Sequence, residues 1–215
     1  LQHAAKRAGV RVDYDCAVSE ERVRSERASC DLLIGADGAG SIVRATYADE
    51  FGPSWHEAKS PYAWLALDGN IEQFIFGYIY VAGKGLIRIT AYPHGERESS
   101  AIVTYSLGLK RMFEDAFMLD GEGYISAQGL QTINEIFAPG LKGRKLFGRS
   151  KWRRFRATQC RHASFGNVAL VGDSYATLHY ETGWGTSAAL QESRILGQIL
   201  GPALDQGKSI EQALK

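Results

Sequence analysis

The sequence predicts an α+β fold, in which an α/β portion is assembled from both ends of the chain and an antiparallel sheet is inserted between about residues 51 and 145. Two observations support this prediction. Short apolar runs lead into glycine-rich turns near both ends, at residues 31–44 and 167–192. Between them, aromatic and β-branched runs are separated by turn residues, as in antiparallel sheets.

The composition argues against several classes of function. The 215 residues are 45% hydrophobic and 23% charged, which suits one large domain or two small ones. A formal net charge of +1 gives no global field favouring nucleic acid or a membrane, and no apolar run approaches the roughly 20 residues that cross a bilayer. Three oddly spaced cysteines fit neither a disulfide framework nor paired metal ligands, so we expect a reducing compartment, the cytoplasm.

The N-terminal elements lead to the first motif. Helical spacing over residues 1–8 predicts a helix that ends at Gly9, residues 10–18 alternate like a half-buried strand, and residues 19–29 indicate a charged hairpin or turn. The apolar run at residues 32–36 then reaches Asp37-Gly38, after which a helix is expected. Such a turn exposes backbone N–H groups where open α/β sheets bind nucleotides, although an ordinary α/β turn has the same pattern.

The middle of the chain predicts the inserted sheet. Its strands are expected at residues 62–67, 74–81, 85–92 and 100–105. Helical spacing over residues 110–117 and 126–137, with Pro139-Gly140 as a stop, predicts two covering helices.

A block of basic residues follows, around Trp152 and Phe155 and without an acidic residue. Its members are Lys142, Arg144, Lys145, Arg149, Lys151, Arg153, Arg154, Arg156 and Arg161. Two interpretations remain open: a solvated strand or loop whose charges stay in water, and contact with the phosphates of a ligand.

The second motif repeats the strand-to-glycine pattern. Residues 167–173 form an apolar run that ends in Gly172-Asp173, and a long helix is predicted after Gly185, with a stop at residues 201–202. Glycines at positions 183 and 185 leave the helix N-terminus without side chains, so a flat or anionic group can approach its amide donors. That arrangement suits an electron-accepting ring.

Together the two motifs resemble the paired DG and GD signatures of single-component FAD-dependent aromatic hydroxylases, the group A flavoprotein monooxygenases. They are Asp31-x-x-x-Gly35-Ala36-Asp37-Gly38-x-x-Ser41-x-x-Arg44, and Val168-x-Leu170-x-Gly172-Asp173 followed by Gly183-x-Gly185-Thr186. They occur in the family's order with an antiparallel segment between them. Residues 62–105 and 178–186 look closest to the branch acting on aromatic acyl-CoA thioesters, such as salicylyl-CoA hydroxylases.

The resemblance implies an incomplete three-layer FAD/NAD(P)-binding α/β domain, formed by residues 1–50 and 146–215, with an antiparallel substrate-binding sheet and covering helices at residues 51–145. It implies an FAD-dependent monooxygenase that hydroxylates a small aromatic substrate, including an aromatic acyl-CoA, with NAD(P)H and O2 through a flavin C4a-hydroperoxide. The flavin performs the chemistry, so no catalytic side chain is expected. Neither metal, nucleic acid nor membrane is expected as a partner, whereas a homodimer stays open.

The resemblance also assigns residues. Asp37 would border the FAD and NAD(P)H phosphates, Arg44 would assist with pyridine nucleotide, and Asp173 would bind ribityl or ribose hydroxyls. The helix after Gly185 would direct its dipole at the flavin pyrimidine ring. The cofactor-binding candidates are Asp37, Gly38, Arg44, Gly172, Asp173, Gly183, Gly185 and Thr186. The substrate-binding candidates are Tyr62, Trp64, Phe76, Tyr78, Tyr92, His94, His179 and Tyr180. For the six candidates at residues 62–94, packing in the core of the sheet is the alternative.

The sequence departs from the family pattern in several places. No Gly-x-Gly-x-x-Gly turn for the ADP part of FAD is found, because the run that starts at Gly38 has Val43 at the third glycine. The chain is therefore expected to begin inside such a protein, and a non-catalytic fragment or FAD-less substrate-binding protein is the alternative. Ala176 replaces a frequent His, and His179-Tyr180 a usual His-Pro pair. Glu192, at a frequent Asp position, is expected to remain a helix-packing or hydrogen-bonding carboxylate.

The second motif also resembles a motif from a different class of enzyme. The run Gly172-Asp173-Ser174-Tyr175-Ala176 after a strand resembles the nucleophile elbow of α/β-hydrolases. That elbow needs a helix starting at the nucleophile, whereas turn signals occupy residues 175–185, which argues against a serine hydrolase.

Overall fold

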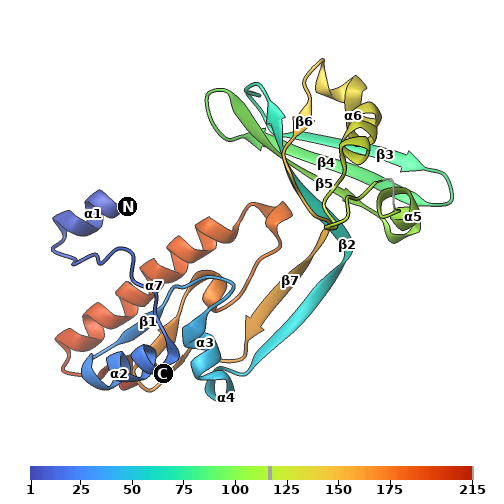
Figure 1. Cartoon of the computed structure of the whole chain (residues 1–215). Helices are drawn as coiled ribbons and strands as arrows, with labels where there is room; N and C mark the ends of the chain where they lie inside the picture. Colours follow the sequence, from blue (N-terminus) through green and yellow to red (C-terminus); the bar gives the residue numbers. More distant parts are fainter. Residues whose placement is uncertain (116–117, 215) are drawn as a thin grey trace. The chain divides into compact units, whose positions relative to one another are not determined.

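The computed structural model describes residues 1–115 and 118–214, and the chain divides into two compact units (Figure 1). Unit 1 comprises Leu1–Trp55 and Thr158–Lys215, and unit 2 comprises His56–Ala157. The two divisions, after residues 55 and 157, come later in the chain than the predicted boundaries after residues 50 and 145. Strand β2 (Pro53–Asp68) crosses the first division, and strand β7 (Arg153–Cys160) crosses the second. The function assigned to each part stays a prediction.

Unit 1 contains a three-stranded sheet of order β1-β9-β8. Strand β1 (Leu33–Gly35) runs parallel to β9 (Val168–Leu170), which pairs antiparallel with β8 (Ser164–Phe165). The register places Ile34 opposite Ala169. The two sequence motifs therefore lie on neighbouring parallel strands, and their turns leave the sheet at the same edge.

Six α-helices accompany this sheet in the described part of unit 1: α1 (Gln2–Arg7), α2 (Glu20–Ser29), α3 (Ile42–Thr46), α4 (Ala48–Phe51), α7 (Gly185–Asp205) and α8 (Ile210–Leu214). The core between them and the sheet includes Val23, Phe51 and Val168. The long helix predicted after Gly185 is confirmed as α7. It continues through Pro202 to Asp205, so the predicted stop at residues 201–202 is wrong.

Two N-terminal predictions are also wrong. Residues 10–18 form no strand, because no described segment pairs with them, and nearly all of their side chains are exposed. Residues 19–29 form helix α2 instead of a turn. Its N-cap Ser19 accepts a hydrogen bond from the backbone N–H of Arg22 at 3.3 Å, and Glu20 and Glu21 occupy the first turn, where negative charge stabilises a helix.

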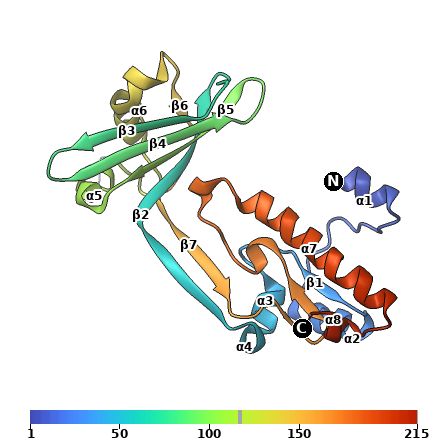
Figure 2. The same cartoon turned by 180° about the vertical axis from the view of Figure 1, so that it is seen from behind.

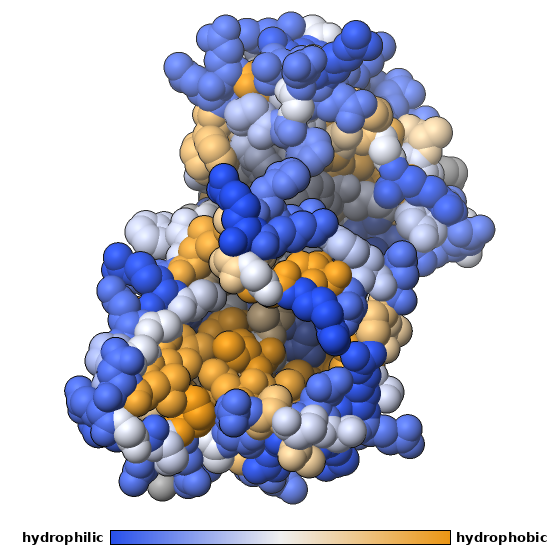
Figure 3. Space-filling model, turned by 90° about the vertical axis from the view of Figure 1, so that its left-hand side faces the viewer, coloured by the Kyte–Doolittle hydropathy of each residue, from blue (hydrophilic) through white to orange (hydrophobic). Residues whose placement is uncertain are grey.

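Apolar side chains gather on one face of unit 1, the lower part of the space-filling view in Figure 3. The exposed apolar residues of this unit include Ile34 on β1, the strand at the edge of the sheet, and Ile195 and Ile199 on α7. The apolar stripe of α7 is thus wider than the part that its own unit covers. Sheets with parallel strands are normally covered on both faces, so exposed apolar side chains beside the parallel pair β1 and β9 are unusual.

Unit 2 is built on an antiparallel sheet of order β3-β4-β5-β2-β6, with β7 also paired to β2. Its further strands are β3 (Ile75–Val81), β4 (Gly85–Pro93), β5 (Glu98–Tyr105) and β6 (Leu146–Phe147). The four predicted strands are therefore confirmed, and β2 begins earlier than its aromatic run suggests.

Helices cover one face of this sheet, and in Figure 2 β3 and β4 lie in front of them. They are α5 (Lys110–Phe113), preceded by the 3-10 turn η1 (Leu107–Leu109), and α6 (Ala127–Leu141). The predicted helix over residues 110–117 is shorter, and Phe117 lies outside the described residues. Helix α6 continues through Pro139 and ends before Lys142, whose φ of 51° is left-handed, so the predicted proline stop is two residues early.

The core of unit 2 joins the inward face of the sheet to these helices. Leu65, Ile89 and Val103 pack with Ile133 and Phe137 of α6. These strand residues alternate with outward-facing neighbours, which leaves the opposite face of the sheet for other contacts.

The three cysteines differ in burial: Cys16 is exposed, Cys30 is intermediate and Cys160 is buried. Burial raises the pKa of the Cys160 thiol. We expect Ellman's reagent to modify Cys16 rapidly and Cys160 only after denaturation, because the thiolate is the reactive form. The raised pKa also means that this group's contribution to stability is full below the ordinary pKa of a thiol and is lost as the pH rises. Equal labelling rates in the native protein would contradict this burial.

Candidate functional site

Asp37, which follows β1, stabilises the start of helix α3. Its Oδ2 accepts hydrogen bonds from the backbone N–H groups of Ile42 at 2.7 Å and Val43 at 3.2 Å. The neighbouring Gly38 has a φ of 77°, and no described atom lies within 4 Å of a Cβ built on it. The carboxylate thus serves the helix N-terminus, and the turn presents open backbone at Gly38.

Arg44 joins the two motifs. The residue is only 7% exposed. Its Nη1 donates hydrogen bonds to the backbone carbonyls of Asp173 at 3.2 Å and Ser174 at 2.8 Å. Its Nη2 donates to the carbonyl of Ala39 in the first turn. The guanidinium is thus directed at carbonyls inside unit 1, and the implied role in pyridine nucleotide binding stays a prediction. Arg44 acts on the site by holding both turns together.

The turn after β9 fits closely against helix α7. Gly172 has a φ of 62°, and a Cβ on it would lie 3.0 Å from the Cβ of Ala189. Its backbone N–H donates to Oε2 of Glu192 at 2.6 Å, which confirms the expected hydrogen-bonding role of that carboxylate. Asp173 follows in the 3-10 turn η2 (Gly172–Ser174) and is exposed, so its side chain is available to a ligand.

Ser174 is not a nucleophile. It is fully buried, and its Oγ lies 2.5 Å from the carbonyl oxygen of Gly35 and 2.6 Å from that of Val171. These two carbonyls are the acceptors for its one hydroxyl proton. A nucleophile elbow exposes its serine at the start of a helix. The hydrolase alternative is therefore wrong.

The N-terminus of α7 is open. Gly183 adopts a φ of 65°, and no described atom lies within 4 Å of a Cβ built on Gly183 or Gly185. The N-cap Trp184 makes no side-chain capping hydrogen bond, and Thr186 in the first turn is exposed. The amide donors and positive dipole end of a 21-residue helix thus face accessible space. The absence of side chains at Gly183 and Gly185 leaves the amide donors open to a planar group with an electron-accepting edge.

His179 and Tyr180 precede this helix. Tyr180 begins the 3-10 turn η3 (Tyr180–Thr182), and its ring centroid lies 4.4 Å from that of His179. The Nδ1 of His179 accepts a hydrogen bond from the backbone N–H of Glu181 at 3.4 Å. Both candidates therefore belong to unit 1, on the segment that leads into α7.

Five of the six strand candidates share the face of the unit 2 sheet opposite the helices, which we call the open face; its exposed candidates lie on β2 and β3, whereas Ile102, Thr90 and Thr104 are buried. One row across the strands is Trp64, Ile102, Thr90 and Phe76, and the next is Tyr62, Thr104, Arg88 and Tyr78. Trp64, Phe76 and Tyr78 are 48%, 56% and 60% exposed, so the core-packing alternative is wrong for them. Tyr92 is on the same face, with its ring edge-on to Trp64 at 6.4 Å.

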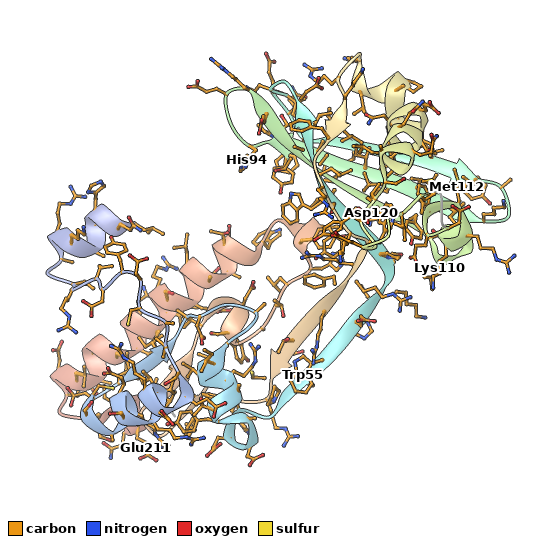
Figure 4. All side chains as sticks on the ribbon, in the orientation of Figure 1. Trp55, His94, Lys110, Met112, Asp120 and Glu211 are labelled. Atoms are coloured by element: carbon orange, nitrogen blue, oxygen red, sulfur yellow. The ribbon has the colours of Figure 1, made fainter. Side chains whose placement is uncertain are left out.

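The remaining candidate, His94, lies past the end of β4 in the turn before β5 and is exposed. Figure 4 shows it at the end of the unit 2 sheet opposite to Lys110 and Met112. It is therefore beside the open face and not on it.

Several residues of the open face are absent from the sequence-based candidates. Phe74 stacks on Tyr92 at 5.4 Å and on Phe76 at 6.1 Å, and Tyr80 is also exposed on β3. Arg88 donates from Nε to the Oγ1 of Thr104 at 3.2 Å. The alternation that identified Phe76 and Tyr78 extends to Phe74 and Tyr80, so the same signal could have found them.

The basic block does not form one patch. Arg149 and Lys151 lie over the ring of Tyr124, at 3.7 and 4.3 Å from its centroid, and Arg154 pairs with Glu57 at 3.5 Å. Lys142, Arg144 and Lys145 occupy the loop between α6 and β6. Among residues 1–115 and 118–214, no group of three or more His, Cys, Asp or Glu side chains could hold a metal ion. None of the helices there has the length and apolarity to cross a bilayer.

Parallel strands with glycine turns at one edge, interrupted in sequence by an antiparallel sheet, define a cofactor-binding α/β unit with a separate sheet unit. The chain belongs to the family of FAD-binding domains, whose model, "FAD binding domain", matches residues 2–214. The open N-terminus of α7, with exposed Asp173 on the neighbouring turn, fits the flavin of that cofactor.

Curated relatives support this membership. The chain is 33% identical over 171 residues to 3-hydroxy-4-methyl-anthranilyl-[aryl-carrier protein] 5-monooxygenase of Streptosporangium sibiricum, covering 79% of this chain and 43% of that protein. It is 28% identical over 218 residues to salicyloyl-CoA 5-hydroxylase of a Streptomyces species, covering 100% of this chain and 41% of that protein. The chain thus spans less than half the length of these relatives.

Solved structures show the same fold. With 2-methyl-3-hydroxypyridine-5-carboxylic acid oxygenase the TM-score is 0.61 at 24% identity, covering 86% of this chain and 48% of the other. With PqsL of Pseudomonas aeruginosa in complex with 2-aminobenzoylacetate it is 0.62 at 20% identity, covering 86% and 49%. The predicted fold, an incomplete FAD-binding α/β domain with an inserted antiparallel sheet, is confirmed.

Proposed function

We propose that this chain is part of a flavin-dependent monooxygenase that hydroxylates an aromatic substrate with NAD(P)H and O2. The observation that carries the proposal is the aromatic open face in a chain of the FAD-binding family. FAD, when bound, supplies the oxygen chemistry, and the residues of this chain bind and orient.

The chain's own residues have separable tasks in this proposal. The open N-terminus of α7 directs its amide donors at the electron-accepting edge of the ring, and exposed Asp173 accepts hydrogen bonds from cofactor hydroxyls. The aromatic side chains of the open face stack on the arene of the substrate. The row containing Arg88 and Thr104 gives this face a polar band, which orients an oxygen substituent of the substrate.

The substrate class follows from the relatives. One is named for salicyloyl-CoA and the other for an anthranilyl group on an aryl-carrier protein. We therefore propose an aromatic acyl thioester as the substrate. Three free cysteines suit a reducing compartment, so we place the protein in the cytoplasm, and a homodimer is compatible with the proposal.

The first experiment tests turnover. The purified chain is mixed with FAD, NADH or NADPH and salicyloyl-CoA under air, and NAD(P)H oxidation and hydroxylated product are followed by absorbance and mass spectrometry. An oxidised-flavin spectrum and substrate-dependent oxidation are expected. A protein that stays colourless after FAD is added, without such oxidation, would support the non-catalytic alternative.

A pair of substitutions tests the open face. Trp64→Leu with Phe76→Leu is expected to weaken substrate binding about 10-fold, because about 1.4 kcal/mol of ring stacking is lost. Both side chains are about half exposed, so thermal unfolding should change little. Tyr14→Leu, at an exposed residue of unit 1, is the matched control. Unchanged affinity in the double variant would contradict the assignment of this face.

A further inference from the structure

The proposed function uses no cation of the basic block, and three of these cations lie on one loop. Lys142, Arg144 and Lys145 lie on the loop between α6 and β6, which we call the basic loop. Arg144 and Lys145 line a cavity of about 540 Å³. The other lining residues are Gln131, Asn134, Glu135, Ala138 and Gly143.

Arg144 is held in place at this cavity. It is half-buried, and its Nη2 donates to the carbonyl of Asn70, in the turn between β2 and β3, at 3.3 Å. A Cβ on Gly69 would lie 3.3 Å from its Nε, so the guanidinium rests on a position that has no side chain. Within the described residues its remaining N–H groups donate to no other acceptor. A pre-positioned guanidinium of this kind matches the bidentate geometry of a phosphate.

The backbone of the basic loop is fixed as well. The N–H of Lys145 donates to Oδ1 of Asp68, and the N–H of Asp68 donates to the carbonyl of Lys145 at 3.0 Å. Asn134 binds the next residue twice: its Oδ1 accepts from the N–H of Leu146 at 2.7 Å, and its Nδ2 donates to the carbonyl of Leu146 at 2.9 Å. The loop therefore presents its cations from a defined position.

The charges of the site favour an anion. Lys142 and Lys145 are exposed, and neither forms an ion pair with a described residue. The carboxylate that lines the cavity, Glu135, accepts a hydrogen bond from Nε2 of Gln131 at 2.8 Å. Two cations, Arg144 and Lys145, thus line the cavity with one carboxylate, Glu135, and Lys142 adds a third positive charge on the same loop. Asp68 is engaged by the loop backbone.

The basic loop lies at one end of the sheet. Leu146, directly after it, pairs with Leu67 near the end of β2, and the turn that follows β2 leads to Phe74 of the open face. The opposite end of β5 leads to α5, with Lys110 and Met112 (Figure 4). The cavity itself is on the α6 side of the sheet, and Arg144 contacts the turn that follows β2. A long ligand with its ring on the open face would therefore pass around this end of the sheet to bring an anionic group to Arg144.

We propose that the basic loop binds phosphate of the pantetheine arm that carries the aryl thioester. This chemistry is shared by coenzyme A and by the phosphopantetheine group of a carrier protein. The inference rests on the proposed function for the identity of the substrate, and on Arg144, Lys142 and Lys145 for the place where its phosphate is held.

Calorimetric titration of the complete chain with coenzyme A tests the site. Lys142→Glu with Lys145→Glu is expected to weaken binding at least about 10-fold at low salt, and added salt should weaken binding to the wild-type chain. Lys84→Glu with Arg111→Glu reverses two exposed charges at the opposite end of the sheet and should leave the affinity unchanged. Arg144→Met should also weaken binding, with its fold checked by circular dichroism.

Further titrants distinguish the sources of the phosphate. Binding of 4′-phosphopantetheine with the same dependence on the lysines supports contact with the arm phosphate. Dependence seen with coenzyme A alone would assign the loop to the nucleotide phosphates and overturn the contact with the arm phosphate. Pantetheine, which has no phosphate, should not respond to the lysine substitutions. The proposal is overturned if wild-type chain does not bind coenzyme A, or if the lysine variant loses no more affinity than the control. Binding of free salicylate to the wild-type chain tests the open face without the basic loop. A chain that binds coenzyme A but not salicylate would therefore contradict the proposed function and leave the phosphate site supported.

Discussion

Replacing Gly185 by leucine is expected to lower the affinity for FAD at least about 100-fold, which corresponds to about 2.7 kcal/mol. Gly185 is the first residue of α7, and no described atom lies within 4 Å of a Cβ built on it. A Cβ at this position therefore meets no described neighbour, and the leucine side chain is expected to fill the space through which the ring approaches the amide donors. Flavin fluorescence titration measures the loss.

The control for this change is Gly197→Leu. Gly197 lies in the same helix, is exposed, and also has no described atom within 4 Å of a Cβ built on it. Its replacement should leave FAD affinity unchanged and slightly favour the helix. Normal affinity in the Gly185→Leu variant would place the flavin somewhere other than the N-terminus of α7.

Replacing Arg44 by methionine is expected to lower the free energy of unfolding by about 3 kcal/mol. Methionine keeps the apolar bulk but removes the donors that satisfy the carbonyls of Ala39, Asp173 and Ser174. The turn that carries Asp173 also loses its tie to the first motif, so FAD affinity should fall in parallel. Urea denaturation, followed by circular dichroism, measures the change.

Arg11→Met is the matched control for Arg44. Arg11 is exposed and pairs with Asp13 at 3.0 Å on the surface of the same unit. Surface ion pairs contribute little, so the change should stay within about 0.5 kcal/mol. A similar small effect at Arg44 would show that its carbonyl contacts do not stabilise the fold.

The elements that the sequence predicts well are those whose pattern is local. The apolar run before Gly172, the long helix after Gly185 and the alternating strands of unit 2 each have a period that a short window contains. Helix α2 was missed because it buries only Val23, so its evidence lies in the capping Ser19 and not in periodicity. The segment at residues 10–18 has a strand's alternation, but a strand also needs a partner.

The candidate site shows the same division. Its glycines could be recognised from sequence, because a turn between strand and helix restricts which residues fit. The role of Arg44 could not, since its acceptors at Asp173 and Ser174 are distant in sequence and become neighbours only when β1 pairs with β9. The bond from Gly172 to Glu192 likewise depends on how α7 lies against the turn.

The two hydrogen bonds between Asn134 and Leu146 also bear on aggregation. Strand β6 closes one side of the unit 2 sheet, and the side-chain amide of Asn134 occupies the donor and acceptor of Leu146 as a neighbouring strand would. An incoming strand finds no free backbone groups at that residue. Asn134 therefore disfavours strand addition to the unit 2 sheet at this position of its β6 edge.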